Sequence, residues 1–168
     1  DRLVIVAPRI AGVTKEVFAD WGDHVKKGQK LALLDSIELG EARANYMKAM
    51  AMLRMAKKNY SREKSLYSQN ICPKKQFLEA TTAYEQARIE LKTLKEKLKL
   101  MGQQETDIQN IKDGKVLSLF AISAPFDGTV IEKNIAVGGL KDAFAPLFTV
   151  SDLTQLWVWF DVYEKDIP

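Results

Sequence analysis

The chain has 168 residues, of which 46% are hydrophobic, which is enough for one ordinary domain or two small ones. Its net charge is +3, and its single cysteine, Cys72, excludes an internal disulfide. No apolar stretch approaches the roughly 20 residues that a membrane-spanning helix needs, and no signal peptide is present. Because the chain starts at Asp1 without an initiator Met, we interpret it as a piece of a longer protein.

Short strands separated by glycines are expected in the first segment. Leu3 to Pro8 is rich in β-branched residues, and a second strand begins at Gly12. The stretch from Gly22 to Gly28 has the composition of a turn, and it precedes an apolar run at Leu31 to Leu34. This segment therefore predicts β structure over residues 1–34.

Heptad-spaced apolar residues then predict two long helices, at about 36–70 and 74–101. In each helix, large apolar residues form one core series and mostly alanines form the other, and only Glu63 breaks the pattern. The first helix supplies Leu39, Tyr46, Leu53, Tyr60 and Tyr67 with Ala42, Ala49 and Ala56; the second supplies Phe77, Tyr84, Leu91 and Leu98 with Ala80, Ala87, Leu94 and Met101. The connection at 68–73 is short enough only for an immediate reversal, so the helices form an antiparallel coiled-coil hairpin roughly 50 Å long.

Local signals mark where these helices begin and end. Asp35 with Glu38 three residues later predicts a capping box at the start of the first helix. Pro73 suits the first position of the second helix, and Gly102 suits a left-handed stop after it.

The segment after the hairpin repeats the first one. Residues 103–114 could form a short helix, and β character returns at Val116. A shift of 116 residues then places Gly12 on Gly128 and Leu31 on Leu147. Because each half is too short to bury its own apolar face, we predict one β domain at 1–34 and 116–152, interrupted by the hairpin region at 35–115. The alternation from Leu156 to Tyr163 predicts one further strand.

The order of these motifs resembles a known family. Ala-Pro followed by Gly and Val, and then Gly-Asp-x-Val-x-x-Gly, resemble the biotinyl/lipoyl module, and its interruption by a helical hairpin resembles the periplasmic adaptors, or membrane fusion proteins, of tripartite RND-type efflux pumps. The segments most similar to the heavy-metal, Czc/Cus-type branch are Leu66-Tyr67, Leu100-Met101-Gly102, Ala124-Pro125-Phe126-Asp127-Gly128-Thr129-Val130 and Ser151-Asp152-Leu153.

The resemblance implies an α+β fold: a lipoyl-like β module made of two half-motifs, a coiled-coil hairpin, and at 153–168 the first strand of an incomplete β-barrel domain. It implies a non-enzymatic adaptor in the periplasm, associated with the inner membrane in the full-length protein. Such an adaptor bridges an inner-membrane RND transporter and an outer-membrane channel in a pump that exports heavy-metal cations. It also self-associates, as a hexamer in the full assembly. An adaptor of another HlyD-like export system remains an alternative.

The resemblance also implies a docking site at the hairpin tip. Related adaptors carry there an Arg, a Leu four residues later and a Ser seven residues after that. Arg62 and Leu66 match, but Pro73 occupies the Ser position and Cys72 precedes it. An Arg could donate charge-assisted hydrogen bonds to a channel protein, and Leu66 could anchor in an apolar pocket. Alternatively, these residues only finish a helix end.

Other residues give weaker indications of chemistry. Biotin and lipoyl carriers need a lysine in the turn between the half-motifs, but Leu34 to Glu38 contains none, so we expect no cofactor. His24 is a lone histidine in a polar turn and makes no metal site, and the hairpin separates it from Cys72, so we expect neither a metal nor catalysis. Four thioethers on the first helix could bind a soft metal, but packing beside the coiled-coil seam is the favoured interpretation. They are Met47, Met50, Met52 and Met55.

The hairpin is the basic part of the chain. Residues 36–101 contain 14 Lys and Arg against 7 Asp and Glu, a balance of +7, which leaves −4 for the rest. A nucleic-acid-binding arm is a second hypothesis. Because no aromatic residues are interleaved with these charges, a solvated coiled-coil surface is favoured, and we expect no nucleic-acid partner.

Overall fold

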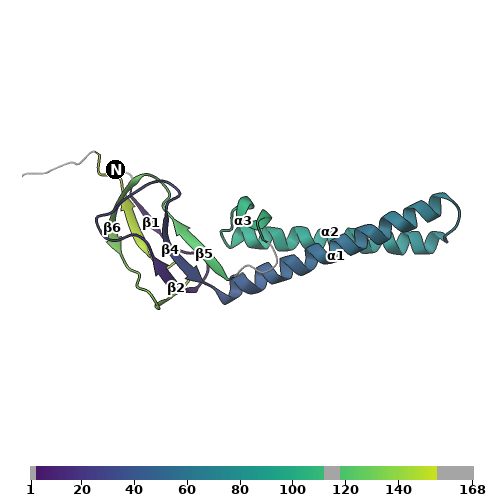
Figure 1. Ribbon diagram of the computed structural model, residues 1–168, viewed down its shortest axis with the longest axis horizontal. Coiled ribbons are helices and arrows are strands. Elements are labelled where there is room, and N and C mark those ends of the chain that lie inside the picture. Colours follow the sequence, from purple (N-terminus) through teal and green to yellow (C-terminus); the bar gives the residue numbers. More distant parts are fainter. Residues whose placement is uncertain (1–2, 112–117, 155–168) are drawn as a thin grey trace, which may run out of the picture.

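The computed structural model describes residues 3–111 and 118–154, and it shows a β module with a long helical hairpin projecting from one end (Figure 1). The hairpin is inserted between two sets of strands that belong to the same module. The predicted fold class, a β module of two half-motifs interrupted by a helical hairpin, is confirmed. The strand expected at 156–163, and with it nearly all of the β-barrel start expected at 153–168, lies outside the described residues.

Each sheet of the module combines strands from both halves of the chain. One sheet has the strand order β1-β8-β6-β3 and the other has the order β5-β4-β2-β7, and all neighbours are antiparallel. The strands of the first half are β1 (Leu3–Val6), β2 (Gly12–Val17), β3 (His24–Val25) and β4 (Lys30–Asp35). Those of the second half are β5 (Leu119–Ser123), β6 (Gly128–Lys133), β7 (Leu140–Lys141) and β8 (Phe148–Ser151).

The two halves repeat the same structure. A shift of 116 residues superposes the bounds of β2 on those of β6 and the bounds of β3 on those of β7. The shift even carries the register irregularity between Thr14 and Glu16 onto the one between Val130 and Glu132. The predicted pairing of two half-motifs into one module is therefore confirmed.

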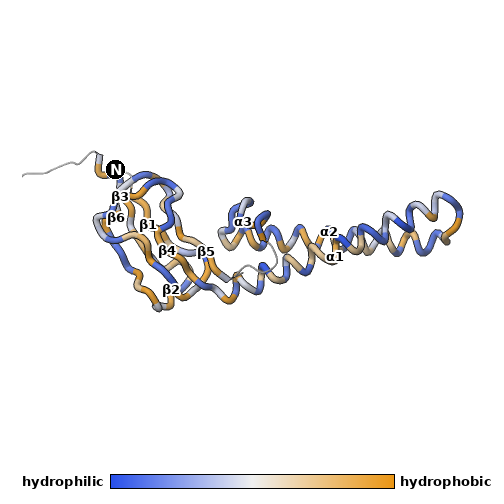
Figure 2. Tube along the Cα trace, in the orientation of Figure 1, coloured by the Kyte–Doolittle hydropathy of each residue, from blue (hydrophilic) through white to orange (hydrophobic). Residues whose placement is uncertain are grey.

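The core of the module is shared by the two halves. Leu31 and Leu34 from β4 and Phe148 and Val150 from β8 are all 0% exposed and belong to one cluster. Fully burying such a side chain stabilises a fold by about 1.5–3 kcal/mol. Because the cluster needs side chains from both ends of the chain, neither half can gain this stabilisation alone. Apolar residues gather along the strands of the module, whereas apolar and polar residues alternate along the hairpin (Figure 2).

Close strand contacts explain one glycine in each half. A Cβ on Gly12 would lie 2.9 Å from the carbonyl oxygen of Asp35, and a Cβ on Gly128 would lie 2.7 Å from that of Ser151. No side chain fits at such distances from a backbone oxygen. The glycine that opens β2 in one half and β6 in the other therefore follows from the approach of the neighbouring strand.

At one turn the two halves share the same backbone conformation but have different residue types. Gly28 has a φ of +80° and donates its N–H to the oxygen of Ala124 at 2.8 Å. Phe144, at the equivalent position of the second half, has a φ of +64° and donates to the oxygen of Pro8 at 2.7 Å. A left-handed backbone is rare and costly for a bulky residue. Because the Phe144 side chain is 74% exposed, core packing does not compensate for this strain.

The hairpin consists of α1 (Ile37–Ser68) and α2 (Lys74–Leu100). All members of the two predicted core series are buried or half-buried except Tyr67, which is 38% exposed. The predicted seam is therefore confirmed. Glu63, which interrupts the series, has a side chain that is only 13% exposed and forms an ion pair with Arg62.

Stacked aromatic rings join the two helices in the distal half of the hairpin. The rings of Tyr67 and Phe77 stack at a centroid distance of 4.9 Å, and Tyr60 lies 6.1 Å from Phe77 and 5.2 Å from Tyr84. Each such pair contributes about 0.5–1.5 kcal/mol beyond its buried area. The four rings form one continuous stack that stiffens the hairpin toward its tip.

The start of α1 differs from the sequence-based expectation. Ser36, not Asp35, is the N-cap, and its hydroxyl accepts from the N–H of Leu39 at 3.4 Å. Asp35 belongs to β4; a hydrogen bond from Ser118 and a contact with Lys15 at 3.3 Å hold its carboxyl pKa below the usual value. The predicted Asp35–Glu38 capping box is therefore wrong, because the strand continues one residue further than expected.

The ends of α2 are closer to their predictions. Pro73 lies one position earlier than expected, as the N-cap of α2. Gly102 has a φ of +88°, which confirms the predicted left-handed stop.

The base of the hairpin forms a second small core with α3 (Glu105–Gln109). Leu39, Leu98 and Ile108 are at most 1% exposed and belong to one cluster. Lys95 and Lys99 form ion pairs with Glu105 and so fasten α3 to α2. The short helix expected within 103–114 is therefore present as α3.

Arg43 connects this base to the β module. Its Nη1 donates to the oxygen of Leu119 on β5 at 2.9 Å, and its Nη2 donates to Oε1 of Gln103. Burial lowers the pKa of the Arg43 guanidinium, and the charge of Asp107 partly opposes that shift. One side chain of α1 thus holds the strand and the loop that follow the hairpin.

Replacing Phe144 with glycine should stabilise the protein. Relief of the left-handed strain should raise the free energy of unfolding by about 1 kcal/mol, measured by chemical denaturation. The matched change Gly28→Ala should lower it, because it introduces the same strain at the equivalent turn. An unchanged or lower stability of Phe144→Gly would contradict the assignment of strain.

A charge in the coiled-coil seam should loosen the hairpin. Leu53→Glu should lower the free energy of unfolding by about 2 kcal/mol, because a half-buried position would hold an unpaired carboxylate. Met55→Glu is the control, since that side chain is 72% exposed and should tolerate charge. Equal melting curves for the two variants, recorded by circular dichroism at 222 nm, would contradict the seam.

Candidate docking site at the hairpin tip

The tip is a tight reversal built around a left-handed asparagine. Asn70 has a φ of +58°, and its N–H donates to the oxygen of Tyr67 at 3.0 Å. The N–H of Ile71 donates to the oxygen of Leu66 at 2.9 Å. These two bonds form a Schellman motif, which satisfies the carbonyls of Leu66 and Tyr67 in the last turn of α1. Leu66 is therefore part of the helix end, and its side chain is half-buried.

Arg62 is exposed but held in place by its own helix. Its Nη2 donates to Oδ1 of Asn59 at 2.6 Å, and its Nε donates to Oε1 of Glu63 at 3.1 Å. The side chain remains 68% exposed, and Nη1 has no partner among the described residues. A planar guanidinium with one nitrogen available can donate to a carbonyl or carboxylate of another protein.

Cys72 points back toward α1. Its Sγ lies 3.5 Å from the carbonyl oxygen of Glu63, and the side chain is half-buried. Burial, followed by the charge and hydrogen bonding of Glu63, raises the pKa of the Cys72 thiol above its usual value. The thiol is therefore a packing group that closes the reversal, while Pro73 next to it is exposed.

Together, the four predicted tip residues lie on one reversal but present different surfaces. Arg62 and Pro73 face solvent, whereas Leu66 and Cys72 are half-buried. Sequence reasoning missed Ile71, which is 63% exposed and is the most exposed large apolar side chain of the reversal. The available signal was an isoleucine directly after the polar run Ser68-Gln69-Asn70.

The remaining sequence candidates are not gathered at the tip. His24 is exposed, and its Nδ1 lies 3.4 Å from Oγ1 of Thr129. Among residues 3–111 and 118–154, no three His, Cys, Asp or Glu side chains lie close enough together to hold a metal ion. None of the helices described is long and apolar enough to cross a membrane.

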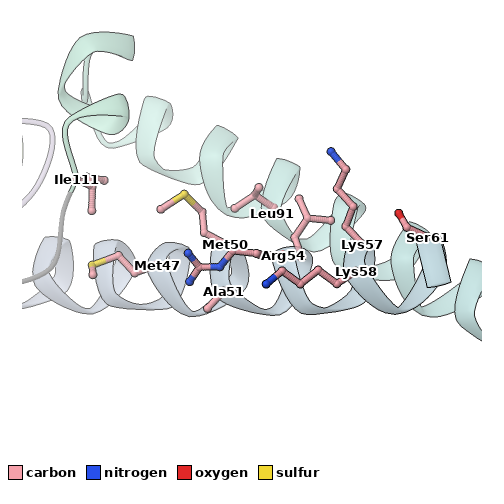
Figure 3. A pocket seen from close by; sticks show the side chains of 10 residues that line it. Met47, Met50, Ala51, Arg54, Lys57, Lys58, Ser61, Leu91 and Ile111 are labelled. Carbon is pink, nitrogen blue, oxygen red and sulfur yellow. The ribbon is translucent and has the colours of Figure 1, made fainter.

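The methionines of α1 border a groove instead of filling the seam uniformly. Met47 packs against the core at the hairpin base, whereas Met55 is 72% exposed. Met47 and Met50 line an open groove of about 900 Å³ together with Leu91 (Figure 3). The cationic residues Arg54, Lys57 and Lys58 share this lining, and none of its described residues carries a carboxylate. Their positive charge opposes binding of a metal cation there.

Comparison with known proteins identifies the family of this fold. A family model described as the CzcB-like barrel-sandwich hybrid domain matches residues 2–152. The chain belongs to the CzcB-like family. This assignment confirms the resemblance to adaptors of the Czc branch that the motif order indicated.

Individual CzcB-like relatives agree with the assignment. The chain is 35% identical over 167 residues to the cobalt-zinc-cadmium resistance protein CzcB of Cupriavidus metallidurans, a match that covers 99% of this chain and 31% of CzcB. It is 28% identical over 150 residues to the nickel-cobalt-cadmium resistance protein NccB of Alcaligenes xylosoxydans xylosoxydans, covering 88% of this chain and 34% of NccB. The chain thus spans about a third of the length of these relatives.

A solved structure shows the same architecture. The crystal structure of ZneB from Cupriavidus metallidurans superposes with a TM-score of 0.69 at 32% sequence identity. The match covers 90% of this chain and 61% of the ZneB chain.

The environment of Cys72 predicts slow thiol chemistry. Because its pKa is raised, the reactive thiolate fraction at pH 8 is smaller than that of an ordinary cysteine. Alkylation by iodoacetamide, followed by mass spectrometry, should be slower in the folded chain than in denaturant. Glu63→Gln should accelerate it by removing the neighbouring negative charge, with Glu79→Gln as the control. Equal rates in the folded and denatured chain would contradict this environment.

Proposed function

We propose that this chain is the central part of a periplasmic adaptor subunit in a tripartite efflux pump for heavy-metal cations. The adaptor bridges an inner-membrane RND transporter and an outer-membrane channel, and it performs no catalysis. The observation that carries this proposal is the insertion of the hairpin: a β module that holds both ends of a projecting rod is suited to bridging. The family match and the metal-resistance relatives support it.

The dimensions of the hairpin suit a bridging role. The 32 residues of α1 extend over about 48 Å at 1.5 Å per residue. The module anchors the base of this rod through the β4–β5 ladder and through Arg43, and the stacked rings stiffen its distal half. A partner held at the tip is thereby kept at a fixed distance from partners of the module. Self-association of the adaptor, as a hexamer in the full assembly, would arrange several rods around one axis.

We further propose that the tip docks onto the outer-membrane channel. Arg62 supplies a preorganised charged donor, and Ile71 and Pro73 supply exposed apolar surface at the reversal. Leu66 and Cys72 shape the reversal that presents these groups. Because Pro73 stands where related adaptors have a serine, the contact with the channel is expected to depend more on Arg62.

A nucleic-acid-binding arm remains the less favoured function of the basic hairpin. Several of the basic side chains face an acidic neighbour on the same helix, as in Lys75–Glu79, Arg88–Glu85 and Lys99–Glu96. Four aromatic side chains of the hairpin stack on one another, and Tyr46 is buried in the core at its base, so these rings do not form an exposed platform for bases.

Charge reversal at the tip tests the docking proposal. Arg62→Asp in the full-length protein should abolish resistance to zinc, cobalt and cadmium in a complemented deletion strain, because the charge-assisted donor is lost. Circular dichroism should show unchanged helicity. Arg88→Asp is the matched control, since Arg88 is an exposed arginine of α2 with an acidic neighbour on the same helix. Full resistance of the Arg62→Asp strain would refute the role of the tip.

A further inference from the structure

A large cleft lies between the β module and the base of the hairpin. It measures about 1000 Å³, and every residue of β5 contributes to its lining. Across from β5, the lining comes from the end of α2, from the loop that follows it and from α3. Figure 1 shows β5 as the strand of the module that faces α3.

The strand that lines this cleft has an open edge. β5 is the last strand of its sheet, and β4 is its only strand neighbour in the part of the chain that the structure describes. The carbonyl of Ser118 accepts from the N–H of Ser36, so that residue is hydrogen-bonded toward the β4 side. Backbone groups alternate in direction along a strand, so those of Leu119 and Ala121 point away from β4. Arg43 donates a hydrogen bond to the carbonyl oxygen of Leu119, whereas Ala121 is exposed.

The cleft is strongly basic. Among the described residues, its lining includes Arg9, Lys27, Lys30, Arg43 and Lys99 but a single carboxylate, that of Asp107. Lys99 is engaged by Glu96 and Glu105. Within residues 3–111 and 118–154, the side chains of Arg9, Lys27 and Lys30 form no ion pair.

Two of these cations have defined positions beside the edge. Lys30 pairs with Ser123 in the β4–β5 register, at the end of the strand. The stem of Arg9 lies over the end of α2, where a Cβ on Gly102 would be 3.2 Å from its Cδ. Positive charge therefore flanks the open edge both on the module and on the hairpin side.

We propose that this cleft binds an extended acidic segment of a partner protein, which adds to the open edge of β5 as a further strand. The backbone N–H and C=O of Ala121 would pair with the segment, as in other cases of strand addition. Alternate acidic side chains of the segment would meet Arg9, Lys27 and Lys30 in charge-assisted contacts. Main-chain hydrogen bonds at the β5 edge would provide affinity for an extended backbone. The basic side chains of the lining would provide preference for acidic sequences.

A peptide-binding experiment tests both parts of the proposal. The probe is a fluorescein-labelled dodecapeptide of alternating Glu and Thr, titrated with the 168-residue chain and followed by anisotropy. It should bind, more weakly as salt is raised, and a Lys–Thr peptide of the same length should not. Hydrogen exchange at the Ala121 amide should slow when the acidic peptide is bound. No binding, or equal binding of the two peptides, would overturn the proposal.

Two variants separate charge from strand addition. The double change Lys27→Glu/Lys30→Glu should weaken binding at least ten-fold, while Lys57→Glu/Lys58→Glu, with the same change in charge on α1, should not. Ala121→Pro should also weaken binding at least ten-fold, because it removes an amide that points away from β4 and should leave the sheet paired. Thermal melting shows whether each variant is folded. If Ala121→Pro is unfolded, hydrogen exchange at the Ala121 amide of the unmodified chain tests strand addition instead: slower exchange with the peptide bound supports it, and unchanged exchange overturns it. Equal losses in both double variants would overturn the proposal.

Other occupants of the cleft would give different results. Inorganic phosphate that displaces the peptide at low millimolar concentration would identify a site for small anions and would overturn strand addition. Concentration-dependent dimerisation that blocks peptide binding, measured by analytical ultracentrifugation, would identify a second copy of this chain as the occupant and would also overturn the proposal. The experiment does not depend on the efflux assay, so its failure would leave the proposed adaptor function intact.

Discussion

The backbone ladders that join distant parts of the chain are the constraint on which the structure depends. Leu3 pairs with Ser151 and Asp35 pairs with Leu119, so residues 148 and 84 positions apart become neighbours. Closing such a loop costs conformational entropy that only the shared core can offset. The hairpin reduces this cost, because its local contacts already return the chain to the place from which it left. The insertion is therefore compatible with closure of the module around it.

The same arrangement makes the rod stiff at both ends by different means. At the base, the β4–β5 ladder holds the start of α1, and Arg43 holds the strand and the loop that follow the hairpin. Toward the tip, large stacked rings replace the aliphatic core, and a Schellman motif satisfies two carbonyls in the last turn of α1. An adaptor that couples distant partners needs this combination, since a loose joint at either end would uncouple them.

Periodic features were predictable from the sequence, whereas features that depend on contacts between distant residues were not. The heptads of the hairpin and the repeat of 116 residues each rest on many positions, so they determined the seam and the paired halves. A single local signal was weaker: Asp35 matched a capping box, but its strand pairing with Leu119 extends β4 and shifts the cap to Ser36. The contact of Arg43 with β5 and the basic cleft could not be predicted, because their residues come together only after the module closes.

The distribution of charge makes the groove beside α1 unfavourable for a metal cation. The groove beside α1 contains thioethers that could attract a soft metal, but Arg54, Lys57 and Lys58 border the same space. Nearby positive charges raise the energy of an entering cation, and none of the described residues that line the groove carries a carboxylate to compensate. This surface is therefore better suited to contact with solvent or protein than to binding a metal cation.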